Sequence, residues 1–180
     1  MSAIVNAANE DMQHLGGVAK AIVDAAGNNG VVQRESAEWI RRHGRLKPGQ
    51  MAAMTSAGNL PCKHVIHVVG PKKAADAHLL RSAVLSALRK AEENRCESVA
   101  LPAISSGIFG FPLQLCAQIL VQCGVEFASK RPRSVKRIVF CNIDTPTATA
   151  FKRALEAEKQ GSGAQGSGGA ATASCGCVIM

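Results

Sequence analysis

The chain has 180 residues, of which 47% are hydrophobic, and carries a formal net charge of +8. That length supports one domain with a substantial core, and we expect neither a membrane span nor a signal peptide, because the sequence shows neither pattern. The charge favours polyanionic partners such as phosphorylated ligands, nucleic acid or an anionic membrane, although a solvated surface explains it equally well. One Trp and no Tyr argue against a base-stacking RNA platform.

The first 27 residues predict a strand, a glycine loop and a helix. Residues 3–5 are apolar, and Val18, Ala21, Ile22 and Ala25 recur at the spacing of one helical face. The Gly16-Gly17 pair between them lets the backbone approach a ligand closely, and a helix start offers free N–H groups to an anion such as phosphate. Many such turns bind nothing, so this loop alone is weak support for a site.

The rest of the chain alternates between strands and helices. Strands are expected at residues 51–56, 64–69, 98–101 and 137–141, and helices at 28–43, 76–94, from Pro112 onward, and 145–158. This alternation predicts an α/β protein whose mostly parallel sheet is covered by helices on both faces.

A second glycine loop, residues 105–110, also follows a strand and precedes a helix. In a parallel sheet both loops lie at the carboxyl ends of strands, where they can hold a diphosphate between them. The first loop does not match GxGxxG, and no P-loop with Gly-Lys-Ser/Thr is present, which lowers the odds of a dinucleotide dehydrogenase or an NTPase.

The cysteines number seven, which is odd, and none forms a CxxC pair: Cys62, Cys96, Cys116, Cys123, Cys141, Cys175 and Cys177. This pattern argues against a disulfide framework and a zinc site. We expect the first five to be small core residues in a reducing compartment. No metal and no cofactor are expected.

The segments IVNAAN, GGVAKAI, LPCKHVIHVVGP and VALPAISSGIFGFPL follow one another as in the macrodomain, a module that binds ADP-ribose. The chain resembles this family over residues 3–157, and looks closest to the first macrodomains of vertebrate macrodomain-containing poly(ADP-ribose) polymerases. The resemblance implies a monomeric three-layer α/β/α protein with a mixed, mostly parallel sheet, whose ligands are ADP-ribose and mono-ADP-ribosylated proteins. Family members usually carry further strands before NAAN, with an Asp that recognises adenine, and we expect this chain to lack them.

The resemblance also implies roles for individual residues. Asn9 would hydrogen-bond the distal ribose, and Asn142 and Asp144 would contact adenine. Asn6 either contacts the ligand or fixes the end of its strand. The phosphates would lie between two groups of residues, of which the last, Phe109, also flanks the distal ribose: Gly16, Gly17 and Val18 on one side, and Ser105, Ser106, Gly107, Ile108 and Phe109 on the other.

The sequence alone does not decide whether the chain is an enzyme or only a binding module. One hydrolytic branch of the family uses an Asp ten residues after the NAAN asparagine, where this chain has Ala19. Another, similar to viral macrodomains, has a His five residues after it, which His14 matches. This implies that Asn9, His14 and Phe109 hydrolyse the ester joining ADP-ribose to Asp or Glu. The alternatives are that His14 only supports the loop, that the chain is a non-catalytic reader, and that it is a basic RNA-binding domain.

The C-terminal part differs in composition. We expect a macrodomain over residues 1–158 and a flexible Gly/Ser/Ala tail over 159–180. The final Cys177-Val178-Ile179-Met180 fits the C-a-a-X pattern for farnesylation, and Cys175 could carry a second lipid. The expected location is therefore the cytoplasm or nucleus, or a cytosolic membrane face if the tail is lipidated; a chance match is the alternative.

Overall fold

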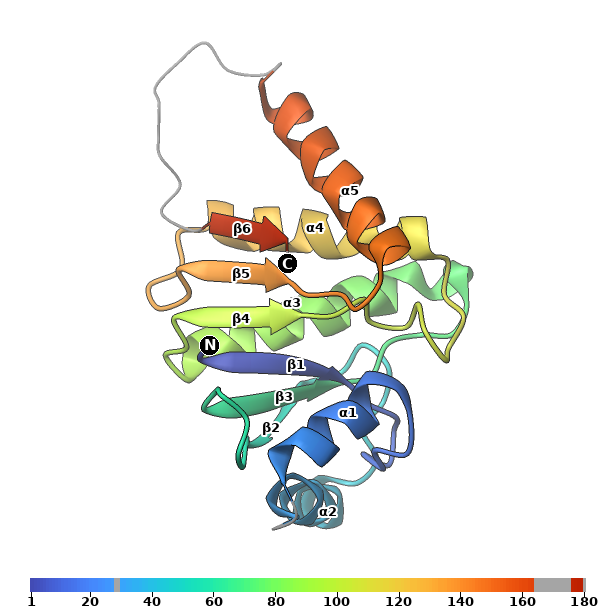
Figure 1. Cartoon of the computed structure of the whole chain (residues 1–180), viewed down its shortest axis with the longest axis vertical. Helices are drawn as coiled ribbons and strands as arrows, with labels where there is room; N and C mark the ends of the chain where they lie inside the picture. The colour runs from blue at the N-terminus through green and yellow to red at the C-terminus, as the bar shows by residue number, and fades with distance from the viewer. Residues whose placement is uncertain (28–29, 164–175, 180) are drawn as a thin grey trace.

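The fold is built on a mixed sheet with strand order β2-β3-β1-β4-β5-β6 (Figure 1). The computed structural model describes residues 1–27, 30–163 and 176–179. Neighbouring strands are parallel except β2 and β3, which are antiparallel. The strands are β1 (Ala3–Ala7), β2 (Ala53–Ser56), β3 (His64–Val68), β4 (Ser98–Leu101), β5 (Arg137–Phe140) and β6 (Gly176–Ile179). The expected mixed, mostly parallel sheet is confirmed.

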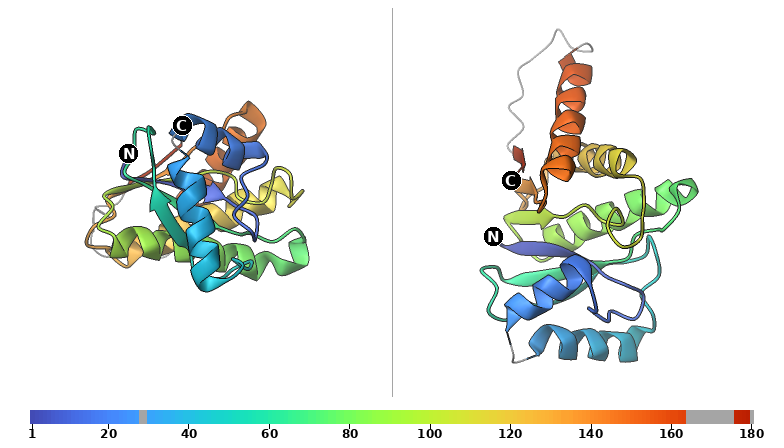
Figure 2. Two further views of the ribbon diagram at one scale, coloured as in Figure 1. Left: turned by 90° about the horizontal axis from the view of Figure 1, so that it is seen from below. Right: turned by 45° about the vertical axis from the view of Figure 1, so that its right-hand side comes forward.

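Helices cover both faces of this sheet. In Figures 1 and 2, α3 and α4 lie on one face, α1 lies on the other, and α5 packs mainly against α4. The helices are α1 (Gly17–Ala26), α2 (Val31–His43), α3 (Ala77–Glu93), α4 (Leu113–Ser129) and α5 (Thr145–Gly163), with a short 3-10 turn, η1 (Ala74–Asp76), before α3. None of the described helices has the length and apolar character needed to cross a membrane.

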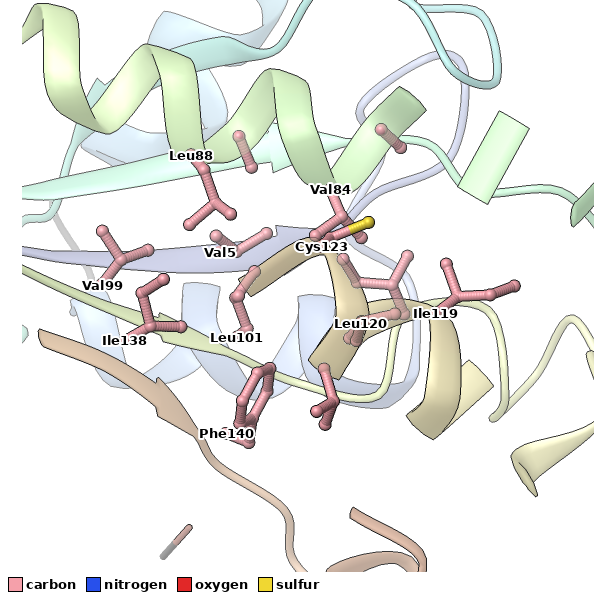
Figure 3. Close-up of a cluster of buried hydrophobic side chains, with 14 of the residues drawn as sticks. Val5, Val84, Leu88, Val99, Leu101, Ile119, Leu120, Cys123, Ile138 and Phe140 are labelled. Atoms are coloured by element: carbon pink, nitrogen blue, oxygen red, sulfur yellow. The ribbon is translucent and has the colours of Figure 1, made fainter. Parts of the chain in front are cut away.

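The main core lies between the sheet and the helices α3 and α4. Figure 3 shows Val84 and Leu88 of α3 and Leu120 of α4 meeting strand residues such as Val99 and Ile138. The apolar face expected for residues 76–94 is confirmed, because all its predicted members are fully buried: Leu80, Ala83, Val84, Ala87, Leu88 and Ala91. Burial of each large aliphatic side chain stabilises the fold by about 1.5–3 kcal/mol, so this layer gives the strand ends a rigid base.

The parallel strands bring distant segments together at one edge. β1, β4 and β5 run in the same direction, so their arrowheads end at the same side of the sheet in Figure 1. The segments that follow them begin at Ala8, Pro102 and Cys141. All three therefore meet at the carboxyl edge, where parallel sheets place ligands.

The end of the chain differs from the expected flexible tail. α5 continues to Gly163 instead of ending at residue 158, because Ala157, Lys159 and Gln160 are good helix formers. Gly176–Ile179 forms β6 beside β5, which satisfies an edge that would otherwise be unpaired. The remaining residues of the expected tail, among them Cys175, lie outside the described residues.

Candidate functional site

A cavity of ≈ 570 Å³ opens at the carboxyl edge of the sheet. Its walls come from the segments after β1, β4 and β5, which are far apart in the sequence. With the exception of His14, every residue that the sequence assigned to ligand binding or catalysis lines it: Asn9, Gly16, Gly17, Val18, Ser105, Ser106, Gly107, Ile108, Phe109, Asn142 and Asp144. The contacts that each would make with a ligand stay predictions.

One wall of the cavity is the start of α1. Gly17 has a φ of 57°, a left-handed conformation that glycine adopts without strain. No side chain caps the helix and its first turn carries no acidic residue. The N–H group of Lys20 makes the first bond of the helix, to the carbonyl of Gly16 at 3.2 Å, so the N–H groups before it are available to an anion.

The opposite wall is the loop that follows β4. The N–H of Gly110 donates to the carbonyl of Gly107 at 2.9 Å, and the N–H of Phe111 donates to that of Ser105 at 3.0 Å, which closes the loop. The side chain of Ile108 reaches across to the first wall: a Cβ atom built on Gly16 would lie 3.1 Å from its Cδ1. The two glycine loops therefore face each other across the cavity, as a diphosphate between them requires.

Gly70 is a site residue that sequence reasoning missed. It lines the cavity although it follows β3, and a Cβ atom there would fall 2.0 Å from the Oγ of Ser105. Ser105 itself has a φ of 72°, and its buried hydroxyl has no hydrogen-bond partner among the described residues. The Gly70-Pro71 pair marks a turn in the sequence, but the close approach of Ser105 depends on the three-dimensional fold.

The segment after β5 forms the far end of the cavity. Asp144 uses both carboxylate oxygens to cap α5, accepting from the N–H of Thr147 at 2.8 Å and from its hydroxyl at 2.9 Å. These bonds hold the pKa of Asp144 below its usual value. The amide nitrogen of Asn142 is buried without a partner among the described residues. Asn142 is therefore the freer polar group at the end where adenine contacts were expected.

Asn9 and Phe109 mark the other end. The Asn9 amide holds its own loop, donating to the carbonyl of Gln13 at 2.8 Å and accepting from the N–H of Gln13 at 2.8 Å. Phe109 is half-buried against a small cluster that includes Met12 and Leu46, so it both packs and lines the cavity. The ammonium nitrogen of Lys72 lies 5.3 Å from the centre of its ring.

His14 does not lie where the catalytic prediction required. It is 6% exposed and does not line the cavity. Its Nδ1 is 3.2 Å from the Asn6 amide nitrogen, and its Nε2 is 3.1 Å from the Ser36 hydroxyl. The chain turns inward between Asn9 and Leu15, where Met12 is fully buried as well. The structure therefore places His14 behind the loop and not at the cavity wall, and its catalytic role stays a prediction.

Asn6 joins His14 to a second buried histidine. The Asn6 amide nitrogen lies 3.0 Å from Nδ1 of His67, whose Nε2 is 2.9 Å from the hydroxyl of Thr55. Burial lowers the pKa of His67 to about 3 and also lowers that of His14. Both rings are therefore neutral at pH 7, and the side chain of Asn6 is held between them at the end of β1.

The cysteines of the described part of the chain do not gather into a metal-binding group. No set of three or more His, Cys, Asp or Glu side chains there is arranged to hold a metal ion. Burial raises the pKa of Cys116 to about 12 and that of Cys123 to about 11, which keeps both thiols protonated. Cys141, expected in the core, is exposed and lines the cavity, because β5 ends one residue before it.

Residues 5–120 match the family model described as Macro domain. An uncharacterized protein of Sulfurisphaera tokodaii is 49% identical over 121 residues, covering 67% of this chain and 65% of that protein. The human protein mono-ADP-ribosyltransferase PARP14 is 41% identical over 160 residues, covering 85% of this chain and 9% of that protein. An O-acetyl-ADP-ribose deacetylase of Citrobacter rodentium is 40% identical over 160 residues, covering 86% of this chain and 88% of that protein.

Two solved structures illustrate the similarity of fold. The Oceanobacillus iheyensis macrodomain with ADP matches with a TM-score of 0.82 and 25% identity, covering 89% of this chain and 86% of that one. The Trypanosoma brucei macrodomain in complex with ADP-ribose matches with a TM-score of 0.78 and 26% identity, covering 86% of this chain and 63% of that one.

Proposed function

This chain belongs to the macrodomain family, and we propose that it binds ADP-ribose and mono-ADP-ribosylated proteins in the ≈ 570 Å³ cavity. The observation that carries the proposal is the pair of facing glycine loops. The uncapped start of α1 lies on one side and the loop around Gly107 on the other. Donors held in this way stabilise a diphosphate without the cost of ordering flexible side chains.

The two ends of the cavity suit the two ends of such a ligand. Asn142 offers an unpaired buried amide at one end. Asn9 and Phe109 offer an amide and an aromatic edge at the other. The orientation that follows puts adenine beside Asn142 and the distal ribose beside Asn9. The named ADP-ribose complex of the Trypanosoma brucei macrodomain supports a ligand of this class.

Calorimetry with ADP-ribose, ADP and adenosine tests this proposal. ADP-ribose should bind more tightly than ADP, because only ADP-ribose reaches the Asn9 end, and ADP more tightly than adenosine, because only ADP fills the space between the loops. Equal affinity for adenosine and ADP would overturn the role of the loops. An affinity for RNA that falls steeply with salt and resists displacement by ADP-ribose would favour the basic RNA-binding alternative.

We propose a second activity, hydrolysis of the ester that joins ADP-ribose to Asp or Glu, on the ground of the similarity to an O-acetyl-ADP-ribose deacetylase. Water attacks the anomeric carbon of the distal ribose, and the bond between that carbon and the ester oxygen breaks. The water oxygen becomes the ribose hydroxyl, the Asp or Glu side chain leaves as a carboxylate, and the remaining proton of the reaction passes to solvent. Cys141 and Asp144 are the titratable residues among those that line the cavity, and both lie at the opposite end. The contribution of Asn9 and Phe109 is therefore to position the ribose for the incoming water.

A single-turnover assay separates this activity from reading alone. The substrate is a protein modified on a glutamate, incubated with excess macrodomain, and the product is free ADP-ribose. Release faster than in buffer alone supports hydrolysis. Intact binding without release leaves the chain as a reader.

A further inference from the structure

A second cavity adjoins the first. It has a volume of ≈ 460 Å³, and Asn9, Gly70 and Phe109 line both cavities. Its other walls include Arg45 and the segment that follows β3, with Lys72 and Lys73. The three shared residues thus form a common wall between a mainly apolar cavity and a strongly charged one.

The common wall lies where the proposed ligand would be joined to protein. The distal ribose is the part of ADP-ribose that carries the modified side chain, and the proposed orientation puts this ribose beside Asn9 and Phe109. Whatever is attached to it leaves the first cavity at these residues. Since the same residues open onto the second cavity, the attached polypeptide would enter that space.

Two of the three acidic groups of the second cavity are already paired within the protein. Arg45 bridges two of them: its Nε is 2.8 Å from Asp11, and its terminal nitrogen is 3.2 Å from Glu10. Asp76 is half-buried at the N-terminus of α3, where the helix dipole stabilises a carboxylate. Glu10 and Asp11 are therefore paired with Arg45, and Asp76 is stabilised by the helix end alone.

The two lysines are different. Lys72 and Lys73 are exposed, and among the described residues neither has a carboxylate within 4.0 Å. The ammonium of Lys72 lies 5.3 Å from the centre of the Phe109 ring, and this cation–π contact keeps the positive charge beside the common wall. The second cavity therefore presents unpaired positive charge near the point where a modified side chain would emerge.

We propose that the second cavity binds the polypeptide segment that carries the ADP-ribose, and that Lys72 and Lys73 bind a carboxylate side chain next to the modified residue. This inference rests on the proposed function, because it takes the position of the distal ribose from it. It adds a preference for the acceptor: acidic residues that flank the modified position strengthen binding.

The test uses two synthetic peptides of equal length, each carrying one ADP-ribose through a linkage that water does not cleave. One peptide has Glu on both sides of the modified position, and the other has Gln. Affinity for both peptides and for free ADP-ribose is measured at one fixed, low salt concentration. We expect the wild-type chain to bind the Glu peptide about five- to tenfold more tightly than the Gln peptide. A difference of this size is what two partly exposed ion pairs contribute to the binding free energy.

Three double variants test whether Lys72 and Lys73 cause the difference in affinity between the two peptides. Lys72→Gln with Lys73→Gln should abolish the preference and leave affinity for free ADP-ribose unchanged, whereas Lys72→Arg with Lys73→Arg should retain it. Lys63→Gln with Lys152→Gln is the matched control, because it removes the same charge from exposed positions outside both cavities, and it should keep the preference.

The results separate the proposed function from the preference for acidic flanking residues. If free ADP-ribose binds but the wild-type chain treats both peptides alike, this inference is overturned and the proposed function stands. Loss of the preference in the control variant to the same extent would assign it to overall charge and overturn the inference as well. Absence of ADP-ribose binding would overturn the proposed function, and the inference with it.

Discussion

The Oγ of Ser105 lies against the α-carbon of Gly70, so closely that a Cβ atom there would fall 2.0 Å from it. We therefore predict that Gly70→Ala forces the loop after β4 away from β3, lowers the free energy of unfolding by about 1–3 kcal/mol, and weakens ADP-ribose binding at least tenfold. Urea unfolding and calorimetry measure the two effects. Gly107→Ala is the control, since a Cβ atom there meets nothing within 4 Å. Equal unfolding midpoints for both variants would contradict the prediction.

The open space at Gly107 also allows a direct test of the phosphate loop. Gly107→Glu should fold normally, because the side chain has room, but it places a carboxylate where the proposed diphosphate lies. We expect calorimetry to detect no ADP-ribose binding, while Gly107→Ala retains most of the affinity. If the glutamate variant binds as the wild type does, this loop does not hold the phosphates.

The proposed hydrolysis predicts a particular pattern of losses at the distal-ribose end. Asn9→Ala and Phe109→Ala should slow single-turnover release of ester-linked ADP-ribose more than they weaken binding, because a positioning contact acts mainly in the transition state. His14→Gln should lower stability, since His14 is buried between Asn6 and Ser36, but leave the rate per folded molecule unchanged. A large loss of rate in folded His14→Gln would instead support the catalytic role that the sequence predicts for His14.

The buried histidines make stability depend on pH. The pKa of His67 is about 3 in the folded state and that of His14 is also lowered, so below pH 6.5 the unfolded chain binds more protons than the folded one. Stability is therefore fully present above pH 6.5 and declines as the pH falls. His67 alone should make unfolding about 2 kcal/mol easier at pH 5 than at pH 7.5.

Urea midpoints between pH 7.5 and pH 5 check this dependence. Replacing His67 by Asn should remove most of it at some cost in stability, whereas replacing the exposed His78 by Gln should leave it intact. This pH range lies above the pKa of the well-bonded carboxylates, such as Glu92. A wild-type midpoint that does not change across it would contradict the burial of neutral histidines.

The C-a-a-X pattern at Cys177 stays a prediction. In the described structure Val178 and Ile179, two residues of this pattern, belong to β6, which pairs with β5.

Local patterns predicted the parts of this fold that depend on local interactions. The spacing of Leu80, Val84 and Leu88 was sufficient to predict the helix α3 and its buried face. Both glycine loops line the cavity, as the sequence predicted. What a sequence pattern does not carry is the neighbour that a residue meets across the fold. Position 70 must be glycine because the side chain of Ser105 occupies the space where a Cβ atom would lie. His14 has the family's spacing from Asn9, but its side chain points into the protein and contacts Ser36.

The C-terminal strand and the second cavity also depend on contacts between segments that are far apart in the sequence. Gly176–Ile179 is too short to predict as a strand, and it pairs because β5 offers a free edge. The second cavity joins Arg45 and Lys72, which lie in separate loops. No motif contains both residues, so their proximity follows only from the packing of these loops.

Ile108 has a consequence for how fast the site exchanges its ligand. Its side chain is 78% exposed, yet its tip lies over Gly16 and Gly17, so it spans the gap between the two walls. For the proposed diphosphate between the two loops, we expect this side chain to swing aside before the ligand enters or leaves. Ile108→Ala should then speed association and dissociation together, and shorten the residence time of a bound ligand, while changing the equilibrium affinity much less.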